Sequence, residues 1–477
     1  MKKAKPMHGT SKAKGCSHAR LGSFCKMFPK LKSWADECEI TEQCEAAEIA
    51  AALGGGNGIM HDTNSSSGDS DVPAAYTFFA QFVDHDVTLD TTSNLHGNPI
   101  SSKEVGHLPN LRSASLDLDC VYGFGPEASP FLYDQRQAGR LLVGNEVNKN
   151  DVPRNTDGTA LIGDPRNDEN LFISQMQLLF LKFHNRRLIG RSFEEAQMDA
   201  RFHYQWIVLH DFLKRICDEN IYNQVIGHLD SFPKFDIKDK CGRVCMPVEF
   251  SVAAYRFGHT LVRSHYPVNG EYPVVDLFDE RFGTEGFSAV PDDLTVDWRF
   301  LLDVEPCHDY VNSKAFDHLF ADELVRLPDP VVGRFASDND RSLAFRNLLR
   351  AYALGLPSGQ TVAQEIKAKG YAIPAHGPDM SKLSGWKCLD PALRKKLTHA
   401  TPLFLYLMAE AGDKNLGNGK RLGPVGSAIL LEVFITMLKE CESILNLPKG
   451  YKGWKPDKCV AKGGELTLAD IVRYVGN

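Results

Sequence analysis

The chain has 477 residues, of which 43% are hydrophobic and 24% charged, a composition typical of soluble globular proteins. Its net charge of −7 excludes the overall basic field that draws proteins to nucleic acid. No run of about 20 apolar residues could span a membrane, and the basic start lacks the apolar core of a classical signal peptide. We therefore expect no nucleic-acid partner and no membrane span. The compartment stays open; without a classical signal peptide, the protein would be cytoplasmic or non-classically secreted.

Helical periodicity recurs along the chain, whereas strand-like alternation is scarce. Residues 1–20 form a basic tail, and residues 21–477 are expected to form one mainly α domain with little β structure. In chain order, helices are predicted to begin at Ala75 and to cover residues 169–189, 202–216, 247–263, 340–352, 403–410, 427–445 and 467–475. The long Gly-, Pro- and Asp-rich segments 93–109 and 267–287 are expected to frame a site, because simple connectors are shorter.

The twelve cysteines leave the redox state open. The sequence contains no CxxC pair, no zinc-type spacing and no haem-attachment CxxCH motif. Disulfides and free, mostly buried thiols fit the sequence equally well.

The helix that begins at Ala75 starts apolar and ends in Asp84-His85-Asp86. Gln81 and His85 are four residues apart and share a face, whereas the two aspartates diverge from His85 by about 100° to either side. Gln81 and His85 can therefore face one cavity while Asp86 faces another environment. Taken alone, the triplet favours a solvated surface cluster over a histidine that acts as acid and base.

Two further segments place polar residues beside apolar helices. Arg166 and Glu169 stand where the helix over residues 169–189 begins, although acidic residues are also common in a first helical turn. His259 follows Gly258 on an apolar segment, and a residue without a side chain lets a flat, bulky group approach the backbone. A hydrogen-bonded core histidine is the alternative for His259.

The motifs Gln-x-x-Asp-His-Asp, Arg-x-x-Glu and Arg-x-Gly-His occur in this order. Together they resemble the peroxidase–cyclooxygenase superfamily, the animal-type haem peroxidases related to myeloperoxidase and lactoperoxidase. Further stretches follow in family order, at residues 116–123, 183–186, 343–350, 354–359, 421–426 and 466–471; the last four resemble the bacterial branch. The resemblance implies a single, mainly α domain built around a haem between a distal and a proximal helix.

On the distal side, the resemblance implies a role for three residues. His85 would take a proton from H2O2 and return it to the departing oxygen. Arg166 would stabilise the negative charge that develops on that oxygen. Gln81 would hold water or halide above the iron.

On the proximal side, the resemblance makes His259 the iron ligand. Asn347 would be its hydrogen-bond partner and would fix the orientation of the ring. Arg256 and Arg350 match arginines that face the haem propionates, where a guanidinium fits a carboxylate.

Asp84 and Glu169 match carboxylates that form ester bonds to haem methyl groups in this family. The resemblance therefore implies a haem b bound covalently through both residues. Asn170 stands where myeloperoxidase has a methionine that adds a sulfonium bond, so we expect no third bond.

Asp86 is expected to turn away from the haem and to bind Ca2+ with the loop around residues 113–119. The resemblance assigns the ligands to Ser113, the carbonyl of Ser115, Asp117 and Asp119. Alternate residues of an extended loop point the same way, and hard oxygen ligands suit calcium. The loop lacks the glycine and the glutamate that an EF-hand requires.

The implied activity is that of a haem peroxidase. H2O2 would oxidise ferric haem to an oxyferryl state, and halide, thiocyanate or a small organic or aromatic reductant would reduce it back to the ferric state. The alternative is a haem-dependent fatty-acid oxygenase, which carries a tyrosine three residues before the proximal histidine. Arg256 occupies that position, and Tyr255 is expected to point to another face. A third alternative, an adhesion relative without haem, conflicts with the retention of the distal and proximal residues.

Overall fold

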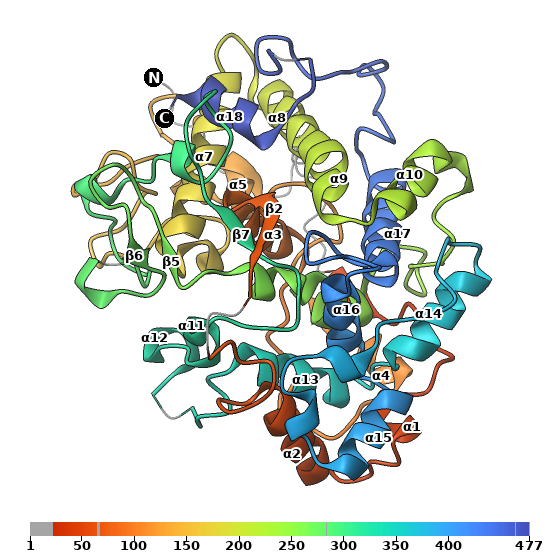
Figure 1. Cartoon of the computed structure of the whole chain (residues 1–477). Helices are drawn as coiled ribbons and strands as arrows, with labels where there is room; N and C mark the ends of the chain where they lie inside the picture. The colour runs from red at the N-terminus through yellow and green to blue at the C-terminus, as the bar shows by residue number, and fades with distance from the viewer. Residues whose placement is uncertain (1–21, 64–66, 283, 335, 463, 477) are drawn as a thin grey trace.

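The computed structural model describes residues 22–63, 67–282, 284–334, 336–462 and 464–476. In this part of the chain, helices pack around an extensive hydrophobic core and strands are short (Figure 1). The mainly α fold is thus confirmed. The tail predicted for residues 1–20 lies outside the described residues, so the division into tail and domain stays a prediction.

The longer helices are α2 (Gln43–Gly54), α3 (Ala75–Val87), α7 (Leu171–Arg187), α8 (Phe193–Ile207), α10 (Glu219–Gly227), α13 (Leu343–Ala353), α14 (Gly359–Ala368), α15 (Pro391–His399), α16 (Leu403–Gly412), α17 (Pro424–Glu440) and α18 (Leu468–Val475). The shorter ones are α1 (Trp34–Glu37), α4 (Ser102–Val105), α5 (Asp119–Tyr122), α6 (Gly125–Ala128), α9 (Leu213–Ile216), α11 (Asp322–Val325) and α12 (Asp329–Val332). No described helix has the length and apolar character needed to cross a membrane.

Helix α3 lies at the centre of the molecule and is buried along almost its whole length (Figure 1). It packs on α7 through stacked rings, Phe78 on Phe172 at 4.6 Å and Phe82 on Phe180 at 4.7 Å between ring centres. Because a helix buried on all sides cannot send polar groups to water, the polar residues at its end must find partners inside the protein.

Several helices differ in extent from the sequence prediction. The helix predicted over residues 202–216 begins earlier, as α8, after a capping box of Ser192 and Glu195. It continues through the π-helical turn η3 (Val208–Phe212) into α9. Helix α7 begins at Leu171, where the Asn170 side chain caps it, and the residues just before it form the 3-10 helix η2 (Pro165–Asp168).

The segment predicted as one helix over residues 247–263 has a different form. It consists of the π-helix η5 (Glu249–Ala253) and the 3-10 helix η6 (Ala254–Leu261). Apolar periodicity does not reveal this change, which places Arg256 and His259 one turn apart because a 3-10 helix has three residues per turn.

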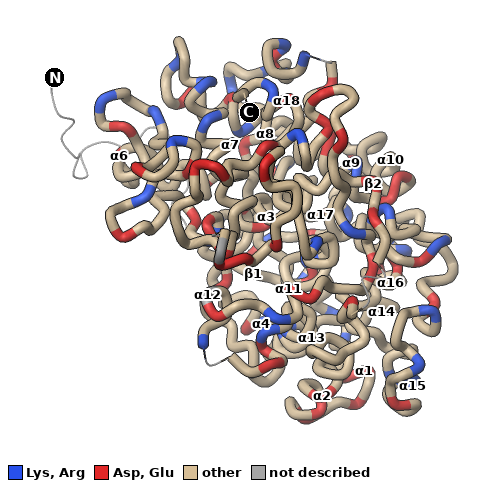
Figure 2. Tube along the Cα trace, turned by 60° about the vertical axis from the view of Figure 1, so that its left-hand side comes forward, with Lys and Arg blue, Asp and Glu red and all other residues tan. Residues whose placement is uncertain are grey.

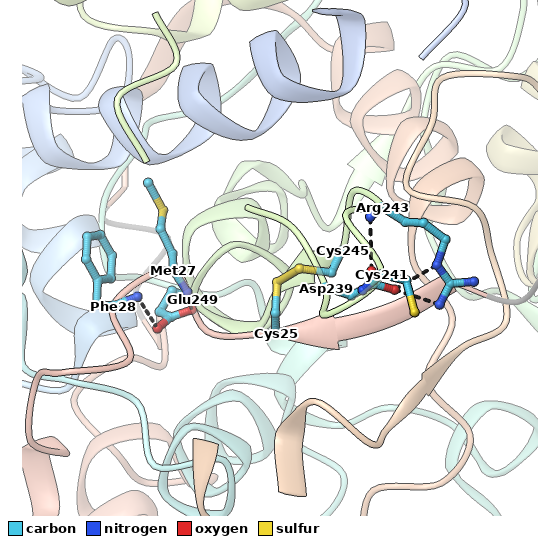
Figure 3. Close-up of a disulfide and its surroundings, with 8 residues drawn as sticks. All are labelled: Cys25, Met27, Phe28, Asp239, Cys241, Arg243, Cys245 and Glu249. Atoms are coloured by element: carbon cyan, nitrogen blue, oxygen red, sulfur yellow. Dashed lines mark hydrogen bonds and ion pairs between the residues drawn. A yellow bond between two sulfur atoms is a disulfide. The ribbon is translucent and has the colours of Figure 1, made fainter. Parts of the chain in front are cut away.

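A small sheet of order β3-β1-β4 holds the first described residues against the start of η5. Strand β1 (Gly22–Cys25) pairs antiparallel with β3 (Pro109–Asn110) and parallel with β4 (Met246–Pro247). A disulfide joins Cys25 to Cys245, and the buried Glu249 carboxylate accepts hydrogen bonds from the backbone of Met27 and Phe28 (Figure 3). The sequence left the redox state of the cysteines open, and the structure shows that Cys25 and Cys245 are oxidised.

Two further ribbons are short. Strand β2 (Asp69–Pro73) pairs antiparallel with β7 (Asn312–Lys314), and β5 (His265–Tyr266) pairs antiparallel with β6 (Val275–Asp276). Acidic and basic residues are interspersed over the described part of the chain (Figure 2), in keeping with the lack of an overall basic field.

Candidate active site

A cavity of about 390 Å³ lies among α3, η2, η6 and α13, a volume typical of ligand pockets. Segments that are far apart in the sequence meet there. All nine residues that the sequence predicts at a haem line the cavity: Gln81, Asp84, His85, Arg166, Glu169, Arg256, His259, Asn347 and Arg350. The segments predicted to frame a site contribute Leu108, Leu277 and Phe278.

His85 lies near the end of α3, with 5% of its surface exposed. Its Nδ1 lies 2.7 Å from Oδ1 of Asn167, and its Nε2 lies 3.8 Å from the Glu169 carboxylate. Burial, reinforced by the charge of Arg166, lowers the pKa of His85 to about 4. The imidazole is therefore neutral at neutral pH, as a proton acceptor requires.

Gln81 is the residue of α3 that is not buried, and it faces the same cavity. Its amide donates a short hydrogen bond to Glu169. Burial raises the pKa of Glu169 to about 7, although Arg166 opposes this shift. Gln81, His85 and Glu169 therefore form one cluster on the cavity wall.

Arg166 is held firmly at the edge of the cavity. Its Nε and Nη2 bind the Asp164 carboxylate, and Nη2 also donates to the carbonyls of Thr88 at 2.7 Å and His85 at 3.1 Å. Within the described residues, Nη1 of Arg166 has no hydrogen-bond partner. The guanidinium is thus fixed by one side of its fork and has one nitrogen to offer a ligand.

His259 lies on η6, and its Nδ1 is 3.1 Å from the amide nitrogen of Asn347 on α13. Burial, with a contribution from Arg256, lowers the pKa of His259 to about 3. A half-turn of the Asn347 amide presents its oxygen to Nδ1–H, which leaves the Nε2 lone pair for a metal.

Gly258 leaves open space beside His259. A Cβ atom added there would meet only the Cβ of Ala80 on α3, at 3.9 Å, and both residues line the cavity. The gap between η6 and α3 therefore accommodates a flat group, and the residues present fit a haem.

The two arginines expected at the propionates both reach the cavity, and each pairs with an aspartate. Arg256 lies 3.1 Å from Asp84, and Arg350 lies 3.1 Å from Asp90. Burial lowers the pKa of Arg350. Because each guanidinium already neutralises a carboxylate, both are placed to exchange that partner for a ligand carboxylate.

A second site lies behind α3. One carboxylate oxygen from each of Asp86, Asp117 and Asp119 lies within 4.8 Å of the others. Oδ2 of Asp86 is buried and, within the described residues, has no hydrogen-bond partner. Burial, with repulsion from Asp117, raises the pKa of Asp86 to about 8. Three converging carboxylates with an unsatisfied oxygen suit a hard divalent cation, so this cluster fits Ca2+.

The two serines predicted as further ligands lie in the same loop. Ser113 donates through Oγ to Asp117 at 2.8 Å, and Ser115 is buried. Arg112 pairs with Asp119 and with Asp164, and thereby links the acidic cluster to the partner of Arg166.

Residues 100–282 match the model of the animal haem peroxidase family. The structure resembles peroxidase A of Dictyostelium discoideum, with a TM-score of 0.57 and 17% identity over 91% of this chain and 89% of that one. The family match covers less than half of the chain, but it includes Arg166, Glu169, Arg256 and His259 of the cavity.

The chain is also similar to two other proteins. The fatty acid alpha-dioxygenase of Oryza sativa gives a TM-score of 0.54 at 15% identity over 94% of this chain and 77% of that one. A stretch of 185 residues is 28% identical to peroxidasin homolog pxn-2 of Caenorhabditis elegans, and covers 33% of this chain and 14% of that protein. The fold is thus shared by peroxidases and dioxygenases, and this chain corresponds to a small part of the nematode relative.

Sequence reasoning placed Tyr255 on another face, and this is wrong. Tyr255 is among the residues that line the cavity. Its hydroxyl is buried and has no hydrogen-bond partner within the described residues.

Asn167 and Gln177 are two further residues of the site that the sequence did not predict; both are buried and linked to His85. The available signal was weak: Gln177 is one of three polar residues, with Ser174 and Gln175, in the mainly apolar first half of α7.

Proposed function

We propose that the chain is a haem peroxidase that uses H2O2 to oxidise halides, thiocyanate or small organic reductants. The observation that carries this proposal is a pair of histidines, His85 and His259, that line one cavity from two different elements. An asparagine contacts Nδ1 of each. Both Nε2 atoms are then available, one as a proton acceptor and one as a metal ligand.

A bound haem b would supply the centre that H2O2 oxidises by two electrons. His259 would hold the iron, with Asn347 fixing its ring, and Arg256 and Arg350 would take the propionates. In the overall reaction, H2O2, a halide ion and a proton yield hypohalous acid and water. With organic reductants, one H2O2 withdraws one electron from each of two molecules and yields two waters.

The proton transfer falls to the distal residues. His85, kept neutral by burial, would take the proton from the near oxygen of H2O2 and deliver it to the departing oxygen. Nη1 of Arg166 would stabilise negative charge on that oxygen. Gln81 would orient water or a halide ion beside His85.

Asp84 and Glu169 would each form an ester with a haem methyl group. Each bond replaces C–H by C–O, a two-electron oxidation that one H2O2, reduced to two waters, would supply. Both carboxylates face the cavity, which supports this proposal. Ca2+ would bind Asp86, Ser113, Ser115, Asp117 and Asp119 and tie the end of α3 to its neighbouring loop.

A fatty-acid oxygenase is the second candidate, favoured by the presence of a tyrosine, Tyr255, among the residues that line the cavity. Arg256, rather than tyrosine, lies three residues before His259, which favours the peroxidase. The test incubates the haem-loaded protein with H2O2 plus bromide, thiocyanate or guaiacol, and separately with palmitate while O2 is monitored. Peroxide-dependent turnover without O2 uptake is expected. Palmitate-dependent O2 uptake without peroxidase turnover would replace the proposal with the oxygenase.

A further inference from the structure

A chain of hydrogen bonds leads from His85 into the protein, away from the cavity. Nδ1 of His85 lies 2.7 Å from Oδ1 of Asn167, and Nδ2 of Asn167 donates to Oε1 of Gln177 at 2.7 Å. Nε2 of Gln177 donates in turn to the backbone carbonyl of Cys120 at 3.1 Å. Asn167 and Gln177 have no exposed surface, so water does not compete for these bonds.

The backbone carbonyl at the far end fixes the direction of the whole chain. A carbonyl oxygen only accepts, so Gln177 must turn its NH2 group to Cys120 and its oxygen to Asn167. Asn167 must then donate to Gln177 and present its own oxygen to His85. The opposite orientation would bring two acceptors together in the interior, which is costly.

We propose that Asn167 and Gln177 are positioning residues that hold neutral His85 as the tautomer with its proton on Nδ1 and its Nε2 lone pair toward the cavity. The proposal rests on the proposed peroxidase function, in which Nε2 is the atom that accepts the proton. The same Oδ1 continues to accept from Nδ1–H after Nε2 has gained a proton, so the ring keeps its orientation throughout.

The test uses ligand binding to the haem-loaded protein rather than turnover. Hydrogen cyanide must give up its proton to a nearby base as it binds iron, whereas CO binds the reduced protein without any proton transfer. Asn167→Leu is expected to slow cyanide association roughly tenfold, the factor that corresponds to one buried hydrogen bond. CO association is expected to stay within about twofold of wild type, because no proton acceptor takes part.

Gln177→Leu is expected to slow cyanide association less, because Asn167 remains but its amide is free to turn. Gln177→Glu keeps an acceptor for Asn167 and is expected to restore most of the rate, which provides a test if Asn167→Leu does not fold. Gln205→Leu is the matched control. Gln205 on α8 is also buried and donates to the carbonyl of Leu116, which lies just before the helix α5 that holds Cys120. It contacts neither His85 nor Asn167.

Unchanged cyanide association in Asn167→Leu would overturn the proposal, as would an equal loss in Gln205→Leu. Cyanide and CO rates that fall together would also overturn it, because they would show general damage to the cavity. A wild-type protein that binds no haem would instead contradict the proposed function. The two failures are therefore distinguishable.

Discussion

A substitution at Gly258 should affect protein stability and haem affinity in different ways. An added Cβ would meet only the Cβ of Ala80, at 3.9 Å, so Gly258→Ala creates no clash within the protein itself. Its backbone φ is not positive, and replacing glycine in a helical segment stabilises by about 0.4–1 kcal/mol. We therefore expect the haem-free variant to be as stable as wild type or slightly more stable.

Haem binding should respond in the opposite direction. If a flat group fills the gap between η6 and α3, the new methyl group overpacks that contact, at a cost of roughly 1–3 kcal/mol. This corresponds to haem binding that is about 5- to 150-fold weaker. The free energy of unfolding is measured by urea denaturation of the haem-free protein, and affinity by titration with haem before any peroxide is added.

The matched control is Gly227→Ala at the end of α10, where an added Cβ meets nothing within 4 Å. Gly227 is not among the residues that line the cavity. This control should leave haem affinity unchanged. Equal haem affinity in wild type and Gly258→Ala would refute the reasoning, because the open space at Gly258 would then not belong to the haem.

Three further predictions follow from other parts of the structure. Asp84→Asn and Glu169→Gln should each remove one ester, and the double variant should release all its haem into acid butanone; protein-bound haem in the double variant would contradict the assignment. Chelation should lower the melting temperature, Ca2+ should restore it, and Asp86→Asn should abolish this response; a response kept by the variant would place the ion elsewhere. Burial raises the pKa of Glu410 to about 8. Between about pH 4.5 and pH 8, the folded state therefore keeps a proton that the unfolded chain has released. The free energy of unfolding should fall by up to about 1.4 kcal/mol per pH unit as pH rises through this range. Glu410→Gln should flatten that slope in urea denaturation across the same range, and an unchanged slope would show that Glu410 is not its source.

Much of the site could be predicted because its residues occur in recognisable local patterns. Gln81, Asp84 and His85 share one helix, and Arg166 and Glu169 share one turn, so short-range spacing already placed them together. The convergence of these segments with His259 and Asn347 on one cavity followed only from the family resemblance. The bacterial-type character of the C-terminal half stays a prediction.

What the sequence did not predict depends on long-range contacts or on the hydrogen-bonding pattern of the backbone. The change from α- to π- and 3-10-helical geometry at η5 and η6 leaves the apolar spacing nearly unchanged, so the sequence pattern did not predict it. The partner of Cys25 lies 220 residues away, and nothing in the local sequence distinguishes Cys245 from its neighbour Cys241. Asn167 contacts His85 from 82 residues away and resembles an ordinary capping residue.

The most direct test of the central claim is the rate at which the haem-loaded protein reacts with one equivalent of H2O2, followed by stopped-flow absorption in wild type and His85→Ala. The account predicts a rapid spectral change in wild type and a rate that is about 100- to 10,000-fold lower in the variant, at equal haem content. Equal rates in the two proteins, or no spectral change in wild type, would contradict the claim that His85 moves the proton of peroxide in this cavity.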